Sequence, residues 1–206
     1  MTRLVSTLRR WLEPLGTSLP ALHLVGGAVR DHLLGRESKD IDLMCADTLA
    51  LARSLAAVHD LALVPFLNKP DAPCLRAVNR ADTEDFLDLV PIHGSSVEDD
   101  LSRRDFTVNA MAIAIGAGGA LGELIDPLGG RQDLRNRLIR AAGPHAFNSD
   151  PVRIVRAVRF AAELGFEIFP ATREMMSGAA SGIAAVAAER VVRELFITLN
   201  QPVSVP

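Results

Sequence analysis

Two aspartates separated by a single residue, Asp40 and Asp42, are the side chains of this sequence best suited to metal chemistry. The run 40–43 is expected to be a strand, where residues two apart project from the same face. Two carboxylates this close repel each other unless a cation lies between them, and Mg²⁺ prefers oxygen ligands of this kind. The pattern therefore indicates a magnesium site. The alternative is a solvated turn after a strand, which explains most isolated pairs of this type.

A diglycine turn precedes this pair in the chain. A short apolar strand ends at residue 25, and Gly26 and Gly27 then allow a tight turn with close approach to a ligand. Residues 28–34 are expected to form a helix that ends at Gly35, with its free N–H groups facing the turn. A helix start of this kind suits a phosphate. A phosphate site followed directly by a metal-binding pair indicates nucleotidyl or phosphoryl transfer.

Two adjacent arginines, Arg103 and Arg104, stand before Asp105 in a segment that we expect to be helical through Asn109. Their guanidinium groups have a fork geometry that suits phosphate oxygens. Asp105 and Asn109 are four residues apart and would share a helix face, where they could bind ribose hydroxyls. On the residues alone, a surface pair that supports the helix is the stronger alternative.

A helix is expected to start at Pro151, because a long apolar period follows this proline. Asp150 and Arg153 lie three residues apart on one face and together offer an acceptor and several donors. Arg156 and Arg159 continue the threefold spacing and could face phosphates or solvent. The alternative for Asp150 is a structural one, since it would serve well as the N-cap of this helix.

Hydrophobic periodicity predicts the remaining elements. A hinge loop with one proline and two adjacent glycines is expected over residues 126–134, where Asp133 would cap or pin the turn. Asp47 is expected to cap the helix predicted over residues 48–58. We expect helices over residues 3–13 and 48–58, and a helical stretch over 172–199 that Gly178 and Gly182 interrupt. Strands are expected over 61–67, 74–78, 85–90, 113–115 and 121–125.

Composition excludes some classes of protein. The 206 residues carry a net charge of −3, so the whole chain is not a basic nucleic-acid binder. Arginines outnumber acids over residues 131–159, and that patch could meet a polyanion, although some of these arginines could simply be solvated. No apolar run is long enough for a membrane span, and no signal-peptide pattern is present, so we expect no membrane partner. Cys45 and Cys74 lack metal-type spacing, which favours reduced thiols and a cytoplasmic location.

Three blocks of the sequence together resemble the class II tRNA nucleotidyltransferase and bacterial poly(A) polymerase family. The first block is Gly26–Asp31 with Lys39–Asp42, the second is Arg103–Ala110 and the third begins at Asp150. The resemblance implies an α/β (α+β) fold: a polymerase-β-like nucleotidyltransferase head with a mixed sheet and flanking helices, followed by a small all-helical neck. It implies a head over residues 1–142 and a neck over 143–206, with the family's body and tail regions absent.

The resemblance also assigns roles to residues. Asp40, Asp42 and Asp88 would bind two Mg²⁺ ions, whereas Asp85 faces the other side of its strand and is expected to be solvated, as are Asp82 and Glu84. Asp150 and Arg153 would read the base edge of the incoming nucleotide, with Ser149 in place of the family's usual glutamate. The residues expected to bind the nucleotide are Gly26, Gly27, Arg30, Arg103, Arg104, Asp105, Asn109, Asp150, Arg153, Arg156 and Arg159.

The activity that follows from the resemblance is template-independent addition of CMP, AMP or both, from CTP and ATP, to the 3′ end of tRNA. The short connection over residues 91–99 argues against full C-C-A addition, because family members that add C usually carry a longer loop there. Two alternatives stay open, namely a poly(A) polymerase and a nucleotide- or RNA-binding fragment without turnover.

Overall fold

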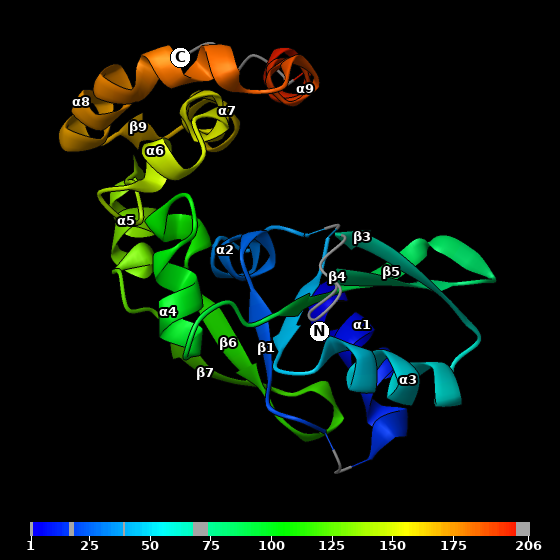
Figure 1. The fold of residues 1–206 in the computed structure, drawn as a ribbon. Coiled ribbons are helices and arrows are strands. Elements are labelled where there is room, and N and C mark those ends of the chain that lie inside the picture. Colours follow the sequence, from blue (N-terminus) through cyan, green and yellow to red (C-terminus); the bar gives the residue numbers. More distant parts are fainter. Residues whose placement is uncertain (1, 17–18, 39, 68–73, 201–206) are drawn as a thin grey trace. The chain divides into compact units, whose positions relative to one another are not determined.

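The computed structural model describes residues 2–16, 19–38, 40–67 and 74–200 (Figure 1). The chain forms two compact units. The first, called the sheet unit below, comprises residues 1–100 and 111–126, and the second, called the helical unit, comprises 101–110 and 127–206. The chain therefore passes between the units at three points in its sequence. The head–neck boundary at residue 142 stays a prediction.

A mixed sheet is the framework of the sheet unit. Within the described residues it has seven strands in the order β3-β4-β5-β2-β1-β6-β7. β2 and β5 run parallel, and the other neighbours run antiparallel. The predicted α/β class with a mixed sheet is confirmed. The strands are β1 (Leu22–Val25), β2 (Asp42–Cys45), β3 (Leu61–Leu67), β4 (Cys74–Asn79), β5 (Asp82–Pro91), β6 (Ala112–Ile115) and β7 (Leu121–Ile125).

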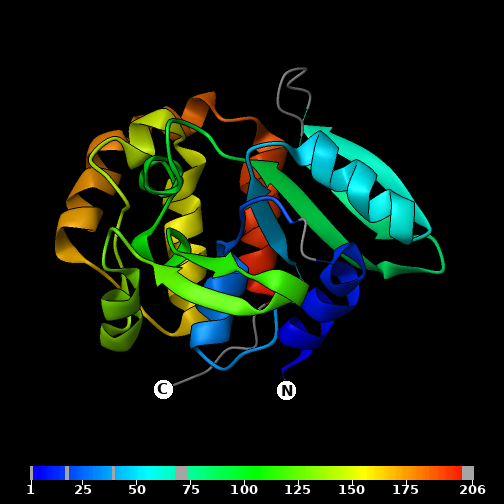
Figure 2. The same cartoon turned by 90° about the horizontal axis from the view of Figure 1, so that it is seen from below.

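Helices flank this sheet, as predicted. In α3 (Thr48–Val58) the Asp47 side chain accepts a hydrogen bond from the Ala50 N–H at 2.9 Å, so the predicted cap is confirmed. This helix lies over β3, β4 and β5 (Figure 2). The first helix, α1 (Arg3–Leu12), begins as predicted and ends one residue early, at a short 3₁₀ turn. The other two helices that begin in this unit are α2 (Gly27–Leu33) and α4 (Val97–Ser102).

The helical unit is organised around three phenylalanines. Phe106 is fully buried, and its ring lies 6.4 Å from that of Phe147 and 5.8 Å from that of Phe160. Aromatic pairs at this spacing add to the stabilisation that burial alone supplies. A two-stranded parallel sheet joins β8 (Leu138–Ile139) to β9 (Glu167–Ile168). The helices are α5 (Gly130–Asn136), α6 (Ala146–Ser149), α7 (Val152–Leu164), α8 (Pro170–Ala179) and α9 (Ala188–Leu199).

The secondary structure predicted for two segments of this unit was wrong. Residues 105–109 are not an α-helix: Phe106 is extended and bridges to Ala141, and only Thr107–Asn109 form a 3₁₀ turn. The predicted loop over 126–134 contains the first turns of α5. Asp133 nevertheless pins this region as expected, because its carboxylate accepts a hydrogen bond from the Thr107 hydroxyl at 2.7 Å.

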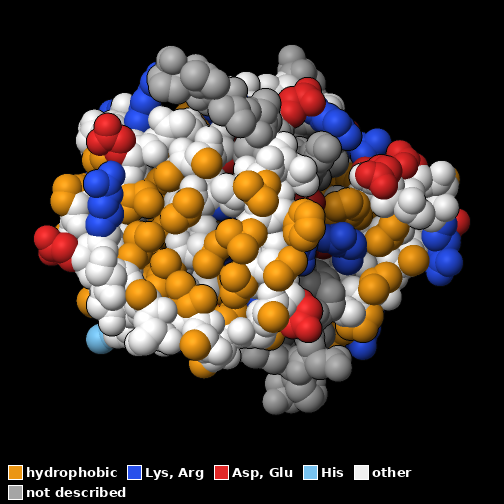
Figure 3. Space-filling model, turned by 90° about the horizontal axis from the view of Figure 1, so that it is seen from above, with side chains coloured by type: hydrophobic (Ala, Val, Ile, Leu, Met, Phe, Trp, Pro, Cys, Tyr) orange, Lys and Arg blue, Asp and Glu red, His pale blue; other side chains and the backbone are white. Residues whose placement is uncertain are grey.

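Helix α9 turns an apolar stripe outward. Val192, Leu195, Phe196 and Leu199 recur at helical spacing and are between 46% and 80% exposed, whereas Glu194 on the opposite face is buried. Figure 3 shows one face of the molecule on which hydrophobic side chains gather. In the described parts of the chain, no helix combines the length and apolar character that a membrane crossing requires.

Candidate functional site

Two of the three predicted metal ligands are brought together by strand pairing. Asp42 is the first residue of β2, and its register partner on the parallel neighbour β5 is Asp88. Neighbouring strands lie about 5 Å apart, and residues in register project from the same face. Asp88 is only 5% exposed, and its N–H donates to the carbonyl of Ile41 at 2.9 Å. A nearly buried carboxylate of this kind needs a cationic partner.

That partner is Arg76 of β4, which the sequence reasoning missed. Arg76 lies opposite Asp88 in the antiparallel β4–β5 pair. Its Nε donates to Asp88 Oδ1 and its Nη2 to Asp88 Oδ2, both at 2.7 Å. The guanidinium also lies 4.0 Å from the centre of the Phe86 ring. The hydrogen bond to Asp88 raises the pKa of Arg76 most strongly, against the effect of burial, and the charges of Asp40 and Asp42 raise it further.

Asp40 is placed differently from the prediction. The strand begins only at Asp42, so Asp40 lies in the segment before it and is exposed. Lys39, between the diglycine turn and this aspartate, falls outside the described residues. Among the residues that the structure does describe, no three acidic, histidine or cysteine side chains are grouped closely enough to hold a metal ion as they stand. The donor chemistry nevertheless fits a divalent cation, because Asp88 already binds one cation, the Arg76 guanidinium, and the charges of Asp40 and Asp42 act on the same group.

The diglycine turn has a conformational role. Gly26 has φ 70° and ψ −135°, which is essentially restricted to glycine, and it precedes α2 as the N-cap. Its N–H donates to the Met111 carbonyl at 3.3 Å. Arg30 is buried, and its guanidinium binds the carboxylate of Asp31 at 2.8 to 2.9 Å. Phosphate binding by Gly26, Gly27 and Arg30 stays a prediction, and the structure already uses the Gly26 N–H and the Arg30 side chain inside the protein.

In the helical unit, Asp105 is the centre of a buried ion network. Arg156 donates to Asp105 Oδ2 from Nη2 at 2.6 Å and from Nε at 3.0 Å. Asn109 donates to Asp105 Oδ1 at 3.2 Å, so the predicted pair does meet although it is not on a helix. Burial alone would raise the pKa of Asp105, but the charge of Arg156 and the hydrogen bonds from Arg156, Asn109 and the Phe106 N–H more than offset it and hold this pKa below its ordinary value.

The network continues through Glu194 of α9. Arg156 Nη1 donates to Glu194 at 3.2 Å, and Arg159 donates to Glu194 and, at 2.8 Å, to Glu163. Both guanidinium groups are part-buried, and the carboxylates Asp105 and Glu194 that they bind are buried and would be left uncompensated without them. Arg156 and Arg159 therefore join α7 to α9, whereas the sequence left both open between phosphate and solvent. Nucleotide binding by these two arginines stays a prediction.

Asp150 and Arg153 also have partners within the helical unit. Asp150 Oδ2 accepts from Arg190 of α9 at 2.7 Å, and no side-chain cap at the start of α7 is formed, so the structural alternative for Asp150 is wrong. Arg153 donates to the carbonyls of Arg103 and Arg104 at 2.9 and 3.1 Å, and to that of Ala146 at 3.2 Å.

These contacts fix the backbone of the paired arginines. The side chain of Arg103 is exposed and that of Arg104 is half-buried.

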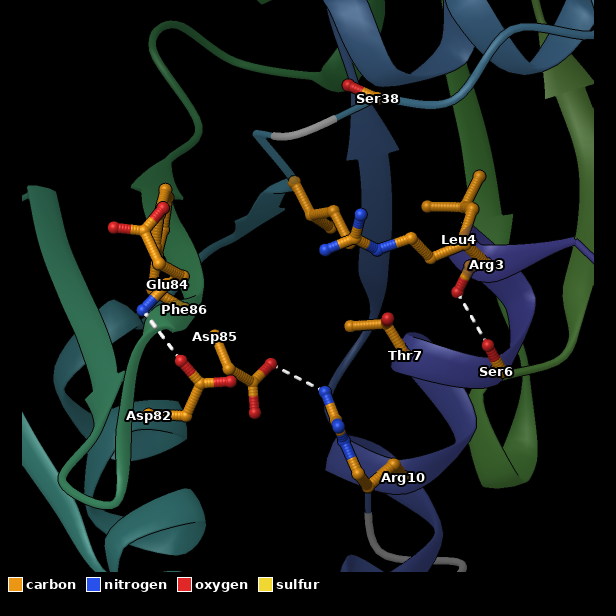
Figure 4. A pocket seen from close by; sticks show the side chains of 11 residues that line it. Arg3, Leu4, Ser6, Thr7, Arg10, Ser38, Asp82, Glu84, Asp85 and Phe86 are labelled. Atoms are coloured by element: carbon orange, nitrogen blue, oxygen red, sulfur yellow. Dashed lines mark hydrogen bonds and ion pairs between the residues drawn. The ribbon is translucent and has the colours of Figure 1, made fainter.

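A polar pocket of about 220 Å³ lies elsewhere in the sheet unit, between α1, β5 and the residues Ser38 and Ile41 (Figure 4). Asp85 points into it and is bound by Arg10, by the Trp11 indole N–H at 3.1 Å and by Asn79 at 3.1 Å. The expectation that Asp85 is solvated was therefore wrong, whereas Asp82 and Glu84 are exposed as predicted. Neither Asp42 nor Asp88 lines this pocket, so it is separate from the paired carboxylates.

The comparisons with known proteins decide which family this arrangement belongs to. The family model described as "Poly A polymerase head domain" matches residues 22–65 and 74–140. The chain belongs to this family. The match contains Asp42, Asp88 and Arg76, and the resemblance deduced from the three sequence blocks is confirmed.

Curated relatives carry related names. The chain is 42% identical over 183 residues to the CC-adding tRNA nucleotidyltransferase of Geobacter sulfurreducens, covering 88% of this chain and 41% of the relative. It is 39% identical over 194 residues to the A-adding tRNA nucleotidyltransferase of Deinococcus radiodurans, covering 92% and 42%. The chain thus spans less than half the length of these two relatives.

Solved structures agree with this assignment. The fold matches that of the Thermotoga maritima CCA-adding enzyme complexed with tRNA with a TM-score of 0.82 at 29% identity, covering 96% of this chain and 50% of that one.

Proposed function

We propose that this chain is the nucleotidyl-transferring part of an enzyme that adds CMP, AMP or both to the 3′ end of tRNA, with CTP and ATP as donors. The observation that carries the proposal is the register pairing of Asp42 with Asp88, whose carboxylate is bound by the Arg76 guanidinium, in a chain of this family. The relatives named as CC-adding and A-adding tRNA nucleotidyltransferases support the substrate class. A cytoplasmic location suits this substrate and the two buried cysteines, which form no disulfide within the described residues.

The paired carboxylates are proposed to hold Mg²⁺. Asp42 and Asp88 offer oxygen ligands from neighbouring strands, and Asp40 lies close enough for its charge to act on the same guanidinium. Bound there, Mg²⁺ ions would make the 3′-hydroxyl of the RNA a better nucleophile and offset the charge that develops on the triphosphate. The chain's own part is to fix the carboxylates on two hydrogen-bonded strands, so that little reorganisation is needed.

Asp150 and Arg153 are proposed to read the base of the incoming nucleotide. Asp150 uses one oxygen, Oδ2, for Arg190, and no bond to its Oδ1 is found among the described residues. The bonds of Arg153 to three carbonyls fix its guanidinium on the segment 103–104, and its N–H groups outnumber those bonds. An oriented acceptor beside an oriented donor is what discrimination between base edges requires.

Addition of a poly(A) tail is the second candidate, and a fragment that binds without turnover is the third. The matching family model is named for poly(A) polymerase, which favours keeping the second. The length of the chain relative to its relatives favours keeping the third.

A primer-extension assay separates these functions. Labelled CTP and ATP are offered with a tRNA lacking its terminus, with the same tRNA carrying one or two C residues, and with an unrelated RNA 3′ end. Limited addition to tRNA ends supports the proposal and shows whether C, A or both are added. Long runs of A on the unrelated RNA would establish the second candidate, and binding without extension would establish the third.

Asp42→Asn tests the site itself. We expect it to reduce incorporation by about a thousandfold or more, because the variant lacks one charged ligand of the paired carboxylates. Asp82→Asn is the matched control, since it removes one carboxylate from the exposed end of β5. Both variants should keep the circular dichroism spectrum of the unmodified chain. Full activity of Asp42→Asn would refute the assignment.

A further inference from the structure

Arg76 is the bidentate partner of Asp88 in the sheet unit. It lies on β4, next to the strand that carries Asp88. Its Nε and Nη2 donate to the two oxygens of that carboxylate, each at 2.7 Å. Bidentate pairs of this geometry are the strongest contacts that a carboxylate makes with a side chain. While the pair is intact, Asp88 is held in one orientation, and both of its oxygens are engaged.

Arg76 lies in the field of more carboxylates than Asp88 alone. Asp42 is the register partner of Asp88, and the charges of Asp40 and Asp42 both act on the Arg76 guanidinium. Asp40 and Asp42 thus add their charges to that of Asp88 at this guanidinium. Such an arrangement is stabilised by any further positive charge, and a divalent cation supplies two.

We propose that Arg76 is the built-in counter-ion of the paired carboxylates, and that a divalent cation binds Asp42 and Asp88 in competition with its guanidinium. This inference rests on the proposed function, because it assumes that these carboxylates take a metal. It assigns Arg76 a positioning role: the arginine holds Asp88 ready before the metal arrives and weakens metal binding by its own charge.

The surroundings of Arg76 allow this exchange. Its side chain is 40% exposed, whereas that of Asp88 is 7% exposed, so the arginine is the partner that can move. The Phe86 ring, 4.0 Å from the guanidinium, can keep the guanidinium in a cation–π contact once Asp88 is released. Phe86 is two residues from Asp88 along β5, so the guanidinium would remain beside the site.

The experiment measures Mn²⁺ binding by calorimetry and melting temperature with and without Mg²⁺, on the full chain. Arg76→Met and Arg76→Gln both remove the charge, and Gln keeps one hydrogen-bond donor. Each should bind Mn²⁺ roughly tenfold more tightly, because a positive charge a few ångströms from the metal is gone. In chelator, each should melt below the unmodified chain, and Mg²⁺ should raise its melting temperature by more than it raises that of the unmodified chain.

Two further variants make the result specific. Arg76→Lys keeps the charge and should bind Mn²⁺ within about twofold of the unmodified chain, which a purely structural role of the arginine would not produce. Arg53→Gln removes one charge from the exposed surface of α3 and should change neither reading.

Failure of this inference differs from failure of the proposed function. If the unmodified chain binds Mn²⁺ and Asp42→Asn abolishes that binding, the metal site stands. Unchanged or weaker binding by both neutral variants would then overturn the role of Arg76 alone. If the unmodified chain shows no Mn²⁺ binding that depends on Asp42, the metal site and the role of Arg76 are both wrong.

Discussion

The thiol of Cys45 is expected to be unreactive because this last residue of β2 is buried. Cys45 is fully buried, and this burial raises its pKa to about 11, although a backbone hydrogen bond at Asp47 acts in the other direction. At pH 8 the thiolate is therefore scarce and shielded. We expect iodoacetamide to modify Cys45 at least a hundredfold more slowly than a free thiol, as measured by mass spectrometry of the peptide. In denaturant the difference should vanish, and rapid labelling of the folded chain would contradict the burial.

Asp105 should be the most costly carboxylate to neutralise in the helical unit. Asp105→Asn leaves the guanidinium of Arg156 without its main partner, and we expect a loss of about 3–5 kcal/mol in the free energy of unfolding at pH 7, measured in urea. Glu174→Gln, at an exposed position of α8, should change it by less than about 0.5 kcal/mol. A loss as small as that of the control would show that the network does not stabilise the unit.

The pH dependence of this loss has a definite sign. Because the folded state holds the pKa of Asp105 below its ordinary value, the unfolded chain binds the proton first as the pH falls. The stabilisation is present above the ordinary pKa of about 3.9 and disappears as the pH falls through the folded value. The stability difference between the unmodified chain and Asp105→Asn should therefore shrink below about pH 4. A difference independent of pH would exclude the ion pair as its source.

At the scale of elements, the diglycine turn combines two positions with different requirements. Gly26 has a positive φ that side chains rarely adopt, whereas at Gly27 a Cβ would meet nothing closer than Arg30 Nη2 at 3.6 Å, an ordinary contact. Gly26→Ala should cost about 1–3 kcal/mol in the free energy of unfolding, and Gly27→Ala close to nothing. Equal effects of the two substitutions would contradict this conformation of the turn.

Elements with strong local signals could be predicted from the sequence. Helix α3 has its predicted bounds because Asp47 caps a regular apolar period, and β3 has its predicted bounds because its apolar run is followed directly by Asn68, Lys69 and Pro70 in the sequence. The segment 105–109 could not be predicted. The Asp105 side chain accepts the Phe106 N–H, and Phe106 pairs with Ala141, so a distant strand partner overrides local helix signals.

Arg76 was missed for a geometric reason. Near the turn of the β4–β5 hairpin Asn79 pairs with Asp82, and continuing that register would place Arg76 opposite Asp85. A register shift between Val78 and Asn79 instead places it opposite Asp88. Irregularities of this kind change which side chains meet, and this sequence carries no local sign of one. The carboxylates of the site were therefore predictable from their motif, but their counter-ion was not.

At the scale of the whole chain, the helical unit depends on a segment that comes early in the sequence. Residues 101–110 supply Phe106 to its core and Asp105 to its ion network, and then the chain returns to the sheet unit. We expect a fragment of residues 101–206 to unfold cooperatively, as followed by circular dichroism, and a fragment of residues 127–206 to show no cooperative transition. A stable 127–206 fragment would show that the inserted segment is dispensable.

The same insertion has a consequence for the diglycine turn. Ala110 closes the inserted segment, and the next residue, Met111, accepts the N–H of Gly26. A displacement of that segment can thus reach the turn through the Ala110–Met111 peptide bond and the hydrogen bond from Gly26 to Met111. Loosening Asp105 by substitution should speed deuterium uptake at the Gly26 amide while leaving amides in α3 as slow as before. Exchange at the Gly26 amide would then report on the integrity of the Asp105 ion network in the helical unit.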